Sequence, residues 1–290
     1  MRDEETGEVY FANSLDEAIS ILSDRERSLV PIAGGTWLMR SEKRKEALAP
    51  GFLALSNVSE LRGFHMESNQ ISIGALTTHH DLGVALEGSP ELFGLADAAR
   101  ISATPGVRRL ATVGGNICTD GFHSPDIATA LLALDAQVEV AGASGTSSLP
   151  LSEYLNSRKE RPLDEILVRV MLPRMAGATS HVRLTMKSSG DYPVAIVSVG
   201  AVISSTSVLS DLRVAIGSVE ETPRRWTALE DALEGRVFRP EECKSQARDL
   251  SVDFNGRDAV DAPGSYRVSV LPHLVQSALA SIFNQKKGGQ

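Results

Sequence analysis

The sequence predicts an α+β fold, and three patterns in it favour this class. The first half alternates between short apolar runs bounded by turn residues and amphipathic segments with helical spacing. The second half places three strand-like segments together, at 181–187, 194–204 and 208–219, before its helices. Strands followed by helices are typical of a sheet covered by helices on one face. The small and polar stretch 174–181 between the halves predicts a domain boundary.

The composition is that of an ordinary globular protein, with enough chain for two or more domains. The chain has 290 residues, of which 42% are hydrophobic and 23% charged. Its formal net charge of −8 argues against nucleic acid or an anionic membrane as the main partner. No stretch reaches the roughly 18 apolar residues of a membrane span. The acidic segment 1–11 also lacks the apolar region of a signal peptide. We therefore expect no membrane partner and no nucleic-acid partner.

The cysteines limit the redox chemistry that this chain could perform alone. Cys118 and Cys243 lie far apart and form no C-x-x-C pair. They cannot by themselves ligate an iron–sulfur cluster, which usually takes four cysteines. A disulfide framework is not indicated either. A reducing cytoplasm is therefore the expected compartment.

The first element with clear signals is a helix that begins after Ser14. Ser14 is a good N-cap residue, Glu17 is its capping-box partner, and Ala18, Ile19 and Leu22 follow at helical spacing. Further strands are predicted at 28–36 (running into a glycine turn), 52–58, 70–78, 109–117 (again running into a turn), 137–142 and 164–173. Further helices are predicted at 78–86, 92–102, 126–136, 225–235 (closed by Gly235), 240–251 and 266–283.

Two segments share a pattern of apolar residues, two glycines and a polar residue. They are "PIAGGTWL" at 31–38 and "ATVGGNI" at 111–117. Glycine lets a backbone approach a ligand closely, and a concave run of N–H groups can bind an anion such as the pyrophosphate of a dinucleotide. Thr36 could add a hydroxyl donor and Asn116 an amide. Neither segment is a G-x-G-x-x-G or G-x-x-x-x-G-K-[ST] motif. The alternative is that both glycine pairs are ordinary tight turns.

Five segments, taken in order, resemble the FAD-binding medium subunit of the molybdenum hydroxylases, the flavoprotein family of xanthine dehydrogenase and carbon monoxide dehydrogenase. They are "PIAGGTWL", "SIGALTTHHDL", "ATPGVRRLATVGGNI", "SPDIATALLALDA" and "GDYPVAIVSVGA". The resemblance extends from residue 14 to the final helix. It implies a two-part FAD-binding domain of the PCMH type (vanillyl-alcohol-oxidase-like) at 1–175, with subdomains at about 1–58 and 59–175. It also implies a C-terminal domain like that of the carbon monoxide dehydrogenase flavoprotein at 180–286, an antiparallel sheet with helices.

The resemblance implies that both glycine segments wrap the FAD pyrophosphate. The residues carried over are Ile32, Ala33, Gly34, Gly35, Thr36 and Trp37 from the first segment, and Thr112, Gly114, Gly115 and Asn116 from the second. Thr77 and Thr78 match a hydroxyl pair near the cofactor. Asp126 matches an acidic residue that binds toward the ribose or adenine; from its position it could also be the N-cap of the helix that follows.

The same resemblance places four more residues near the flavin ring. Leu167 matches a ring contact, and Lys187 lies near a basic position that would stabilise negative charge at the pyrimidine edge. Asp191 and Tyr192 match residues close to the isoalloxazine. Without the resemblance, Lys187 would be a surface lysine and Tyr192 a core tyrosine.

The chain also departs from the family pattern. Trp37 replaces a small or acidic residue, and Gly106 stands where relatives often have glutamine. The run "FHSPD" at 122–126 lacks two residues usually found before the aspartate. His79, His80 and His123 are spaced unconvincingly for a metal site, and we expect no metal on this chain.

The function implied by the resemblance is electron transfer through FAD within a larger hydroxylase. A large subunit would carry molybdenum–molybdopterin and hydroxylate an N-heterocycle or a related substrate, and a small subunit would carry two [2Fe–2S] clusters. The complex would be a dimer of heterotrimers, and the flavin would pass electrons to an external acceptor. No nucleophile–base pair is recognisable, so no catalytic residue is named here. The alternatives are a stand-alone FAD-dependent oxidoreductase, a UDP-sugar reductase that shares the FAD-binding fold, and a binding module that has lost FAD.

Overall fold

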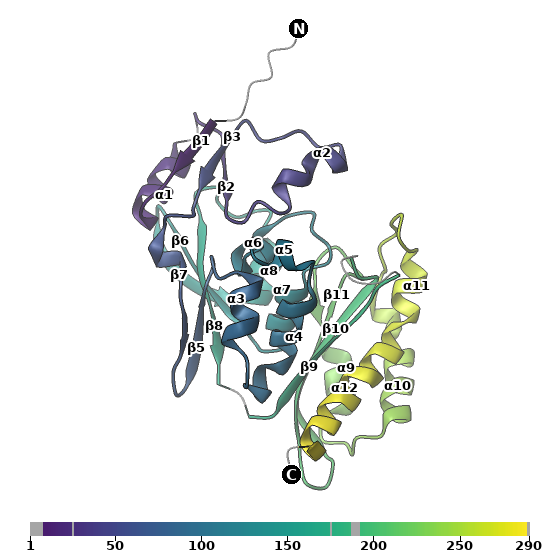
Figure 1. The fold of residues 1–290 in the computed structure, drawn as a ribbon. Helices are drawn as coiled ribbons and strands as arrows, with labels where there is room; N and C mark the ends of the chain where they lie inside the picture. Colours follow the sequence, from purple (N-terminus) through teal and green to yellow (C-terminus); the bar gives the residue numbers. More distant parts are fainter. Residues whose placement is uncertain (1–7, 25, 175, 187–191, 289–290) are drawn as a thin grey trace.

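The computed structural model describes residues 8–24, 26–174, 176–186 and 192–288. Figure 1 shows a small sheet with helices α1 and α2 at one end, a larger sheet with helices α3 to α8 in the middle, and a third sheet with helices α9 to α12 at the other end. The molecule is therefore a mixed helix-and-sheet protein, as the sequence predicts, and it is built from three sheets.

The first sheet is parallel and has the strand order β1-β3-β2. Helix α1 starts after Ser14, whose hydroxyl accepts from the Glu17 amide, and the Glu17 carboxylate accepts from the Asn13 amide. The predicted cap is therefore present, with the reciprocal bond made one residue earlier than in the usual capping box. The elements of this part are β1 (Glu8–Phe11), α1 (Leu15–Ser23), β2 (Leu29–Ile32), η1 (Leu38–Arg40), α2 (Ser41–Arg44) and β3 (Gly51–Ala54).

The second sheet is antiparallel, in the order β4-β5-β8-β6-β7, and its two faces pack against different neighbours. The pairing of β6 with β8 shifts between Glu139 and Val140, where Val168 is an extra residue on β8 and changes the alternation of that strand. Leu167 and Val170 consequently share the core with helices α3 to α8, whereas Val168 belongs to the core with the first sheet. The strands are β4 (Phe64–Met66), β5 (Gln70–Gly74), β6 (Gln137–Gly142), β7 (Gly145–Pro150) and β8 (Ile166–Pro173).

The helices of this middle part contribute several residues to the cavity described below. They are η2 (Ser59–Leu61), α3 (His79–Ala85), η3 (Pro90–Leu92), α4 (Phe93–Ile101), α5 (Pro105–Arg108), α6 (Val113–Cys118), α7 (Asp126–Leu132) and α8 (Leu151–Ser157). Helix α6 corrects one expectation, because the second glycine pair lies in its first turn and not in a strand-to-turn segment. Strand β7, which completes the hairpin with β6, is an element that the sequence analysis missed.

The third sheet is antiparallel, in the order β12-β11-β10-β9, and has helices on both faces. Helices α9, α10 and α12 cover one face, and α4 and α7 of the middle part cover the other (Figure 1). The predicted final helix is divided in two, and Pro272 stands near the start of the second piece, where its missing N–H costs no hydrogen bond. The elements are β9 (Ala178–Leu184), β10 (Ala195–Ile203), β11 (Leu209–Gly217), β12 (Arg224–Arg225), α9 (Thr227–Leu233), α10 (Pro240–Asp249), η4 (Leu250–Asp253), α11 (Gly264–Ser269) and α12 (Leu271–Gly288).

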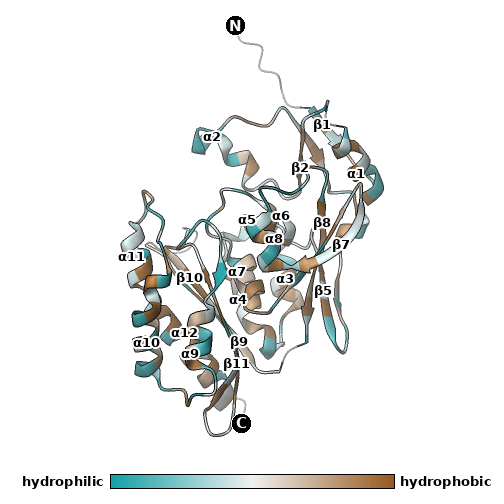
Figure 2. Cartoon of the chain, turned by 180° about the vertical axis from the view of Figure 1, so that it is seen from behind, coloured by the Kyte–Doolittle hydropathy of each residue, from teal (hydrophilic) through white to brown (hydrophobic). Residues whose placement is uncertain are grey.

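The middle and third parts share a continuous interface. Ala215 of β11 belongs to the core of the middle part, and the Gly94 amide at the start of α4 donates to the Thr179 hydroxyl of β9 at 2.8 Å. Figure 2 shows hydrophobic colour along the strands between the helix layers and hydrophilic colour on the outer sides of α1 and α10. No helix in the described part of the chain is both long enough and apolar enough to cross a bilayer.

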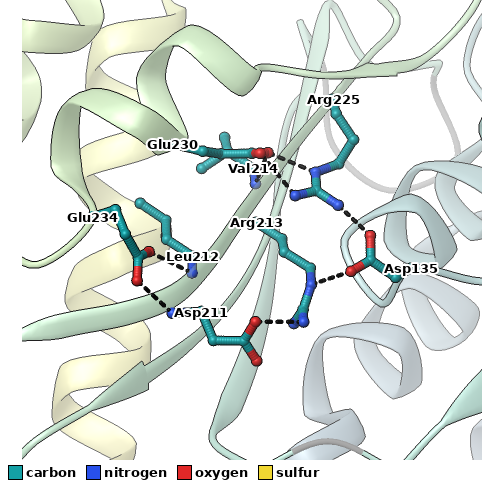
Figure 3. Close-up of polar contacts among 8 residues, drawn as sticks. All are labelled: Asp135, Asp211, Leu212, Arg213, Val214, Arg225, Glu230 and Glu234. Atoms are coloured by element: carbon teal, nitrogen blue, oxygen red, sulfur yellow. Dashed lines mark hydrogen bonds and ion pairs between the residues drawn. The ribbon is translucent and has the colours of Figure 1, made fainter.

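Charged side chains form ion pairs between the middle part and the third sheet (Figure 3). Asp135, which follows α7, accepts from Arg213 of β11 and from Arg225 of β12. Arg225 also makes a bidentate pair with Glu230 at 2.6 and 2.7 Å, and Glu230 in turn accepts from the Val214 amide at 2.8 Å. A single loop carboxylate of the middle part is thus held by two arginines of the third sheet.

Candidate cofactor-binding site

A large cavity lies where the first sheet, the second sheet and helices α5 to α8 meet. Its volume is about 710 Å³, which is in the range of pockets for organic cofactors. Of the residues named from the sequence, the cavity is lined by Ala33, Gly34, Gly35, Thr36, Trp37, Thr112, Gly114, Gly115, Asn116, Asp126, Leu167 and Tyr192. Residues from distant parts of the chain therefore share one cavity.

The first glycine segment forms a true loop between β2 and η1. Gly35 has a φ of +65°, a conformation that glycine adopts without strain. A side chain at Gly34 would meet the Leu110 carbonyl oxygen at 1.8 Å, so only glycine permits this contact with the chain leading into α6. The amides of residues 34–37 make no hydrogen bond with any part of the chain that the structure describes. The loop thus offers several backbone donors to an anion in the cavity.

The second glycine segment differs from this expectation. Thr112 is the N-cap of α6, and its hydroxyl accepts from the Gly115 amide at 3.1 Å. The Gly114 amide donates to the Ala75 carbonyl at 2.8 Å, and the Val113 amide to the Thr77 carbonyl at 2.9 Å. These amides already have partners within the chain, unlike those of the first loop, and contact of the second segment with the pyrophosphate stays a prediction. The segment packs beside the cavity, where a side chain on Gly114 would lie 2.9 Å from the Ala75 side chain.

Asn116 is held in place by helix α7. Its side-chain oxygen accepts from the Ala128 amide at 3.0 Å, and the side chain is buried. This contact fixes the orientation of the amide, and its NH₂ group can serve as a donor toward the cavity that Asn116 lines.

Three of the predicted residues do not line the cavity. Thr78 is the N-cap of α3 and accepts from the Asp81 amide at 3.1 Å, and the Thr77 hydroxyl donates to the Gly63 carbonyl at 3.3 Å. Ile32 is the last residue of β2. Contact of these side chains with a cofactor stays a prediction. Lys187 and Asp191 lie outside the described residues.

Asp126 is buried and paired with the third sheet. The N-cap of α7 is Pro125, so the expectation that Asp126 caps this helix is wrong. Its carboxylate instead lies 3.1 Å from Nε2 of His181 and 3.5 Å from Nε of Arg183, both on β9. A buried carboxylate needs such partners, because an unpaired charge is costly away from water. Asp126 also lines the cavity, so its contact with a ribose stays a prediction that the structure permits.

Aromatic rings gather at one part of the cavity wall. The Trp37 ring centroid lies 5.0 Å from that of Phe122 and 6.2 Å from that of Tyr192. Arg44 stacks on Trp37 at 4.0 Å, and Arg40 donates to the Tyr192 hydroxyl at 3.1 Å. Trp37, the departure from the family pattern, is therefore part of an aromatic cluster that contains Tyr192.

Several lining residues were not predicted as cofactor ligands. His79 and Arg158 both line the cavity, and each has one buried nitrogen without a hydrogen-bond partner among the described residues. These atoms are Nε2 of the His79 ring and Nε of the Arg158 guanidinium. Cys118 also lines the cavity and accepts from the Tyr154 hydroxyl at 3.2 Å. Unpartnered buried polar atoms are rare in proteins, so these atoms together with the free loop amides fit a polar cofactor. The sequence signal that could have indicated His79 is its position directly after Thr77 and Thr78, the hydroxyl pair expected near the cofactor.

The two parts of the chain match two described families. Residues 4–175 match the FAD binding domain in molybdopterin dehydrogenase, and residues 181–282 match the CO dehydrogenase flavoprotein C-terminal domain. The carbon monoxide dehydrogenase medium chain of Hydrogenophaga pseudoflava is 26% identical over 278 residues, which cover 94% of this chain and 95% of that relative. The nicotine 6-hydroxylase medium subunit of Paenarthrobacter nicotinovorans is 26% identical over 273 residues, which cover 92% and 93%.

A solved structure shows the same fold. It is a carbon monoxide dehydrogenase from Hydrogenophaga pseudoflava that lacks the Mo-pyranopterin moiety of the molybdenum cofactor. The match has a TM-score of 0.88 at 26% identity and covers 96% of this chain and 98% of that chain.

The fold, the cavity and these matches define an FAD-binding flavoprotein with oxidoreductase function. The chain belongs to the FAD-binding medium subunits of the molybdenum hydroxylases. The family, the fold class and the FAD cofactor expected from the sequence are thereby confirmed.

Proposed function

We propose that this chain is the FAD-carrying electron-transfer subunit of a heterotrimeric molybdenum hydroxylase. Its partners would be a large subunit with molybdenum–molybdopterin and a small subunit with two [2Fe–2S] clusters, assembled as a dimer of heterotrimers in the cytoplasm. Residues 1–175 would bind FAD, and residues 180–286 would form the C-terminal domain. The observation that carries the proposal is the family match over both parts, combined with a cavity whose wall contains unused polar groups.

The first glycine loop would bind the pyrophosphate. Its amides at residues 34–37 are unused in the described structure, and several backbone donors can hold an anion without a lysine or arginine. Gly115 and Asn116 would form the opposite wall, where the absence of a side chain on Gly115 leaves room for the phosphates. The aromatic cluster of Trp37, Phe122 and Tyr192 would limit the access of water to the flavin end.

Bound FAD would supply the redox chemistry, taking electrons from the small subunit and passing them to an external acceptor. This chain's residues bind, orient and enclose the cofactor. We propose an N-heterocycle or a related compound as the substrate of the whole complex. The support is the similarity to the nicotine 6-hydroxylase medium subunit, which is 26% identical to this chain. The carbon monoxide dehydrogenase medium chain has the same identity of 26%.

The first test is a visible absorption spectrum of the purified chain, followed by acid release and identification of the chromophore. Released FAD supports the proposed cofactor role. Gly115→Asp should remove the colour, because the new carboxylate crowds and repels the pyrophosphate. Gly106→Asp is the matched control, since nothing lies within 4 Å of a side chain placed at Gly106. A colourless wild-type chain that also fails to take up added FAD would contradict the proposal.

The second test concerns the partners. The complex isolated from its source should contain two further chains, with about one molybdenum and about four iron atoms per FAD if two [2Fe–2S] clusters are present. A chain that oxidises its own substrate without metal-containing partners would instead be a stand-alone oxidoreductase. Rates on a panel of N-heterocycles, aldehydes and carbon monoxide would then identify the substrate class.

A further inference from the structure

We propose that His79 binds FAD directly, with Nε2 of a neutral imidazole accepting a hydrogen bond from a hydroxyl of the ribityl chain or the ribose. The inference rests on the proposed binding of FAD in the cavity and assigns a further residue to it.

The position of His79 places its ring beside the glycine segments. His79 is the first residue of α3, and its amide donates to the Ala111 carbonyl at 2.9 Å. Ala111 follows Leu110, the residue whose carbonyl touches Gly34 of the first loop. The His79 side chain is only 3% exposed and lines the cavity. The ring therefore stands close to the point where the two glycine segments meet.

One ring nitrogen of His79 is satisfied and the other is not. Nδ1 lies 2.8 Å from the Ser102 hydroxyl. Nε2 makes no hydrogen bond of normal geometry with the described residues, although the Thr112 carbonyl lies beside the ring. The Ser102 hydroxyl donates to the Ala99 carbonyl at 3.3 Å. In the proposed tautomer the Ser102 hydroxyl gives its single proton to the Ala99 carbonyl, so that Nδ1 carries the ring proton and Nε2 keeps a lone pair.

The surroundings of His79 favour the neutral ring. Burial lowers the pKa of His79 to about 4, although the Asp126 carboxylate and the Thr112 carbonyl act in the opposite direction. Arg108 adds a smaller lowering effect. At neutral pH the ring is consequently uncharged, and in the proposed tautomer its Nε2 is an unused acceptor.

An unused acceptor in a cavity wall selects the kind of atom that it can contact. A pyrophosphate has only acceptor oxygens at neutral pH, so it would be repelled by the Nε2 lone pair and would stay on the loop amides. Hydroxyl groups flank the pyrophosphate of FAD on both sides, on the ribityl chain and on the ribose. One of these hydroxyls would satisfy Nε2 and remove the cost of a buried polar atom without a partner.

The test is a titration of the apoprotein with FAD, measured by quenching of flavin fluorescence or by calorimetry. His79→Phe keeps an aromatic ring and removes the acceptor, and we expect the dissociation constant to rise about tenfold. His80→Phe is the matched control, because His80 is the next residue of α3 and is exposed. It should bind FAD like the wild type. Unchanged affinity in His79→Phe, with wild-type binding intact, would overturn the inference; loss of wild-type binding would instead contradict the proposed function.

Two smaller ligands distinguish the sources of the hydroxyl. FMN contains the ribityl chain without the adenosine, and ADP contains the ribose and the pyrophosphate without the flavin. If the partner is a ribityl hydroxyl, His79→Phe weakens FMN binding and leaves ADP binding unchanged. If the partner is a ribose hydroxyl, the pattern is reversed. Equal binding of both ligands by His79→Phe and wild type would contradict the proposed contact.

A second measurement does not depend on the folding of a variant. Nitrogen NMR of the wild-type protein, labelled in the histidine rings, should show an unprotonated Nε2 for His79, with a resonance that moves when FAD is added. A protonated Nε2, or a resonance that FAD leaves unchanged, would overturn the inference.

Discussion

The Asp126 carboxylate lies 3.1 Å from Nε2 of His181, and this contact joins the wall of the cavity to the C-terminal sheet. His181 is itself fixed by the Ser198 hydroxyl, 2.8 Å from its Nδ1. All three residues are buried. A residue expected to bind the cofactor thus depends on a domain that contributes little else to the cavity, and the two domains are expected to act as one structural unit.

We expect His181→Ala to destabilise the protein and to weaken FAD binding. The substitution leaves the buried Asp126 carboxylate without its ring donor, and loss of a buried charged hydrogen bond typically costs about 1–3 kcal/mol. His273→Ala is the control, because His273 is an exposed residue of α12. Urea unfolding of both variants gives the comparison. Equal stability of the two variants would mean that the pair does not hold the interface.

A smaller effect is expected at the arginine pair around Asp135. The Asp135 side chain is 48% exposed, so solvent weakens its ion pairs with Arg213 and Arg225. Asp135→Asn should lower the free energy of unfolding by about 1 kcal/mol, and the loss should shrink in high salt. Asp231→Asn, at an exposed position in α9, serves as the control. A loss that does not depend on salt would point to loop geometry instead, since Asp135 has a φ of +50°.

Cys118 is open to the cavity but should be a slow thiol. Although Cys118 is accessible from the cavity, desolvation by the surrounding protein raises the pKa of its thiol to about 11, and the hydrogen bond from Tyr154 acts against this. At pH 8 only roughly 0.1% of the thiol is ionised, so alkylation should be on the order of a hundredfold slower than for an ordinary cysteine. The rate should rise up to about pH 11, and FAD should protect the residue. Cys118→Ser identifies the signal, because Cys243 is buried. A rate that already levels off near pH 8 would contradict this expectation.

The sequence was a good guide to the local elements around the site and to the first glycine loop. The helix at Ser14 has the predicted cap, and the PIAGGTWL segment is the predicted strand and loop. The prediction of a strand and a turn at the second glycine segment was wrong, because two glycines rarely start a helix. Here Thr112 caps α6, and the Ala75 carbonyl accepts from Gly114. The cap involves neighbouring residues, but Ala75, directly after β5, is distant from Gly114 in sequence.

The environment of Asp126 could not be predicted for a similar reason. Its partner His181 is 55 residues away in sequence and belongs to another domain. Local pattern favoured an N-cap at Asp126, and the structure places Pro125 there because the carboxylate is used across the interface. His79 was likewise visible only as a histidine near a helix start. Its unused Nε2 became evident once the fold placed Ser102 beside the other ring nitrogen.

The low pKa of His79 predicts how the apoprotein responds to acid. The unfolded chain takes up a proton at this ring near pH 6.5, whereas the folded protein does so only near pH 4. The unfolded state therefore binds more protons between these values, and folding stability falls as the pH is lowered through this window. Going from pH 7 to pH 5, the contribution of His79 amounts to a loss of about 2 kcal/mol.

His79→Phe should remove this part of the pH dependence, because phenylalanine does not titrate and has no buried polar atom. Apo His79→Phe should then be more stable than the wild type at pH 5, while it binds FAD more weakly. His80→Phe should keep the wild-type slope, since that residue is exposed. The measurement is urea unfolding of the three proteins at pH 7, 6 and 5. Parallel curves for His79→Phe and wild type would show that the His79 ring titrates alike in the folded and the unfolded protein, and burial would then not lower its pKa.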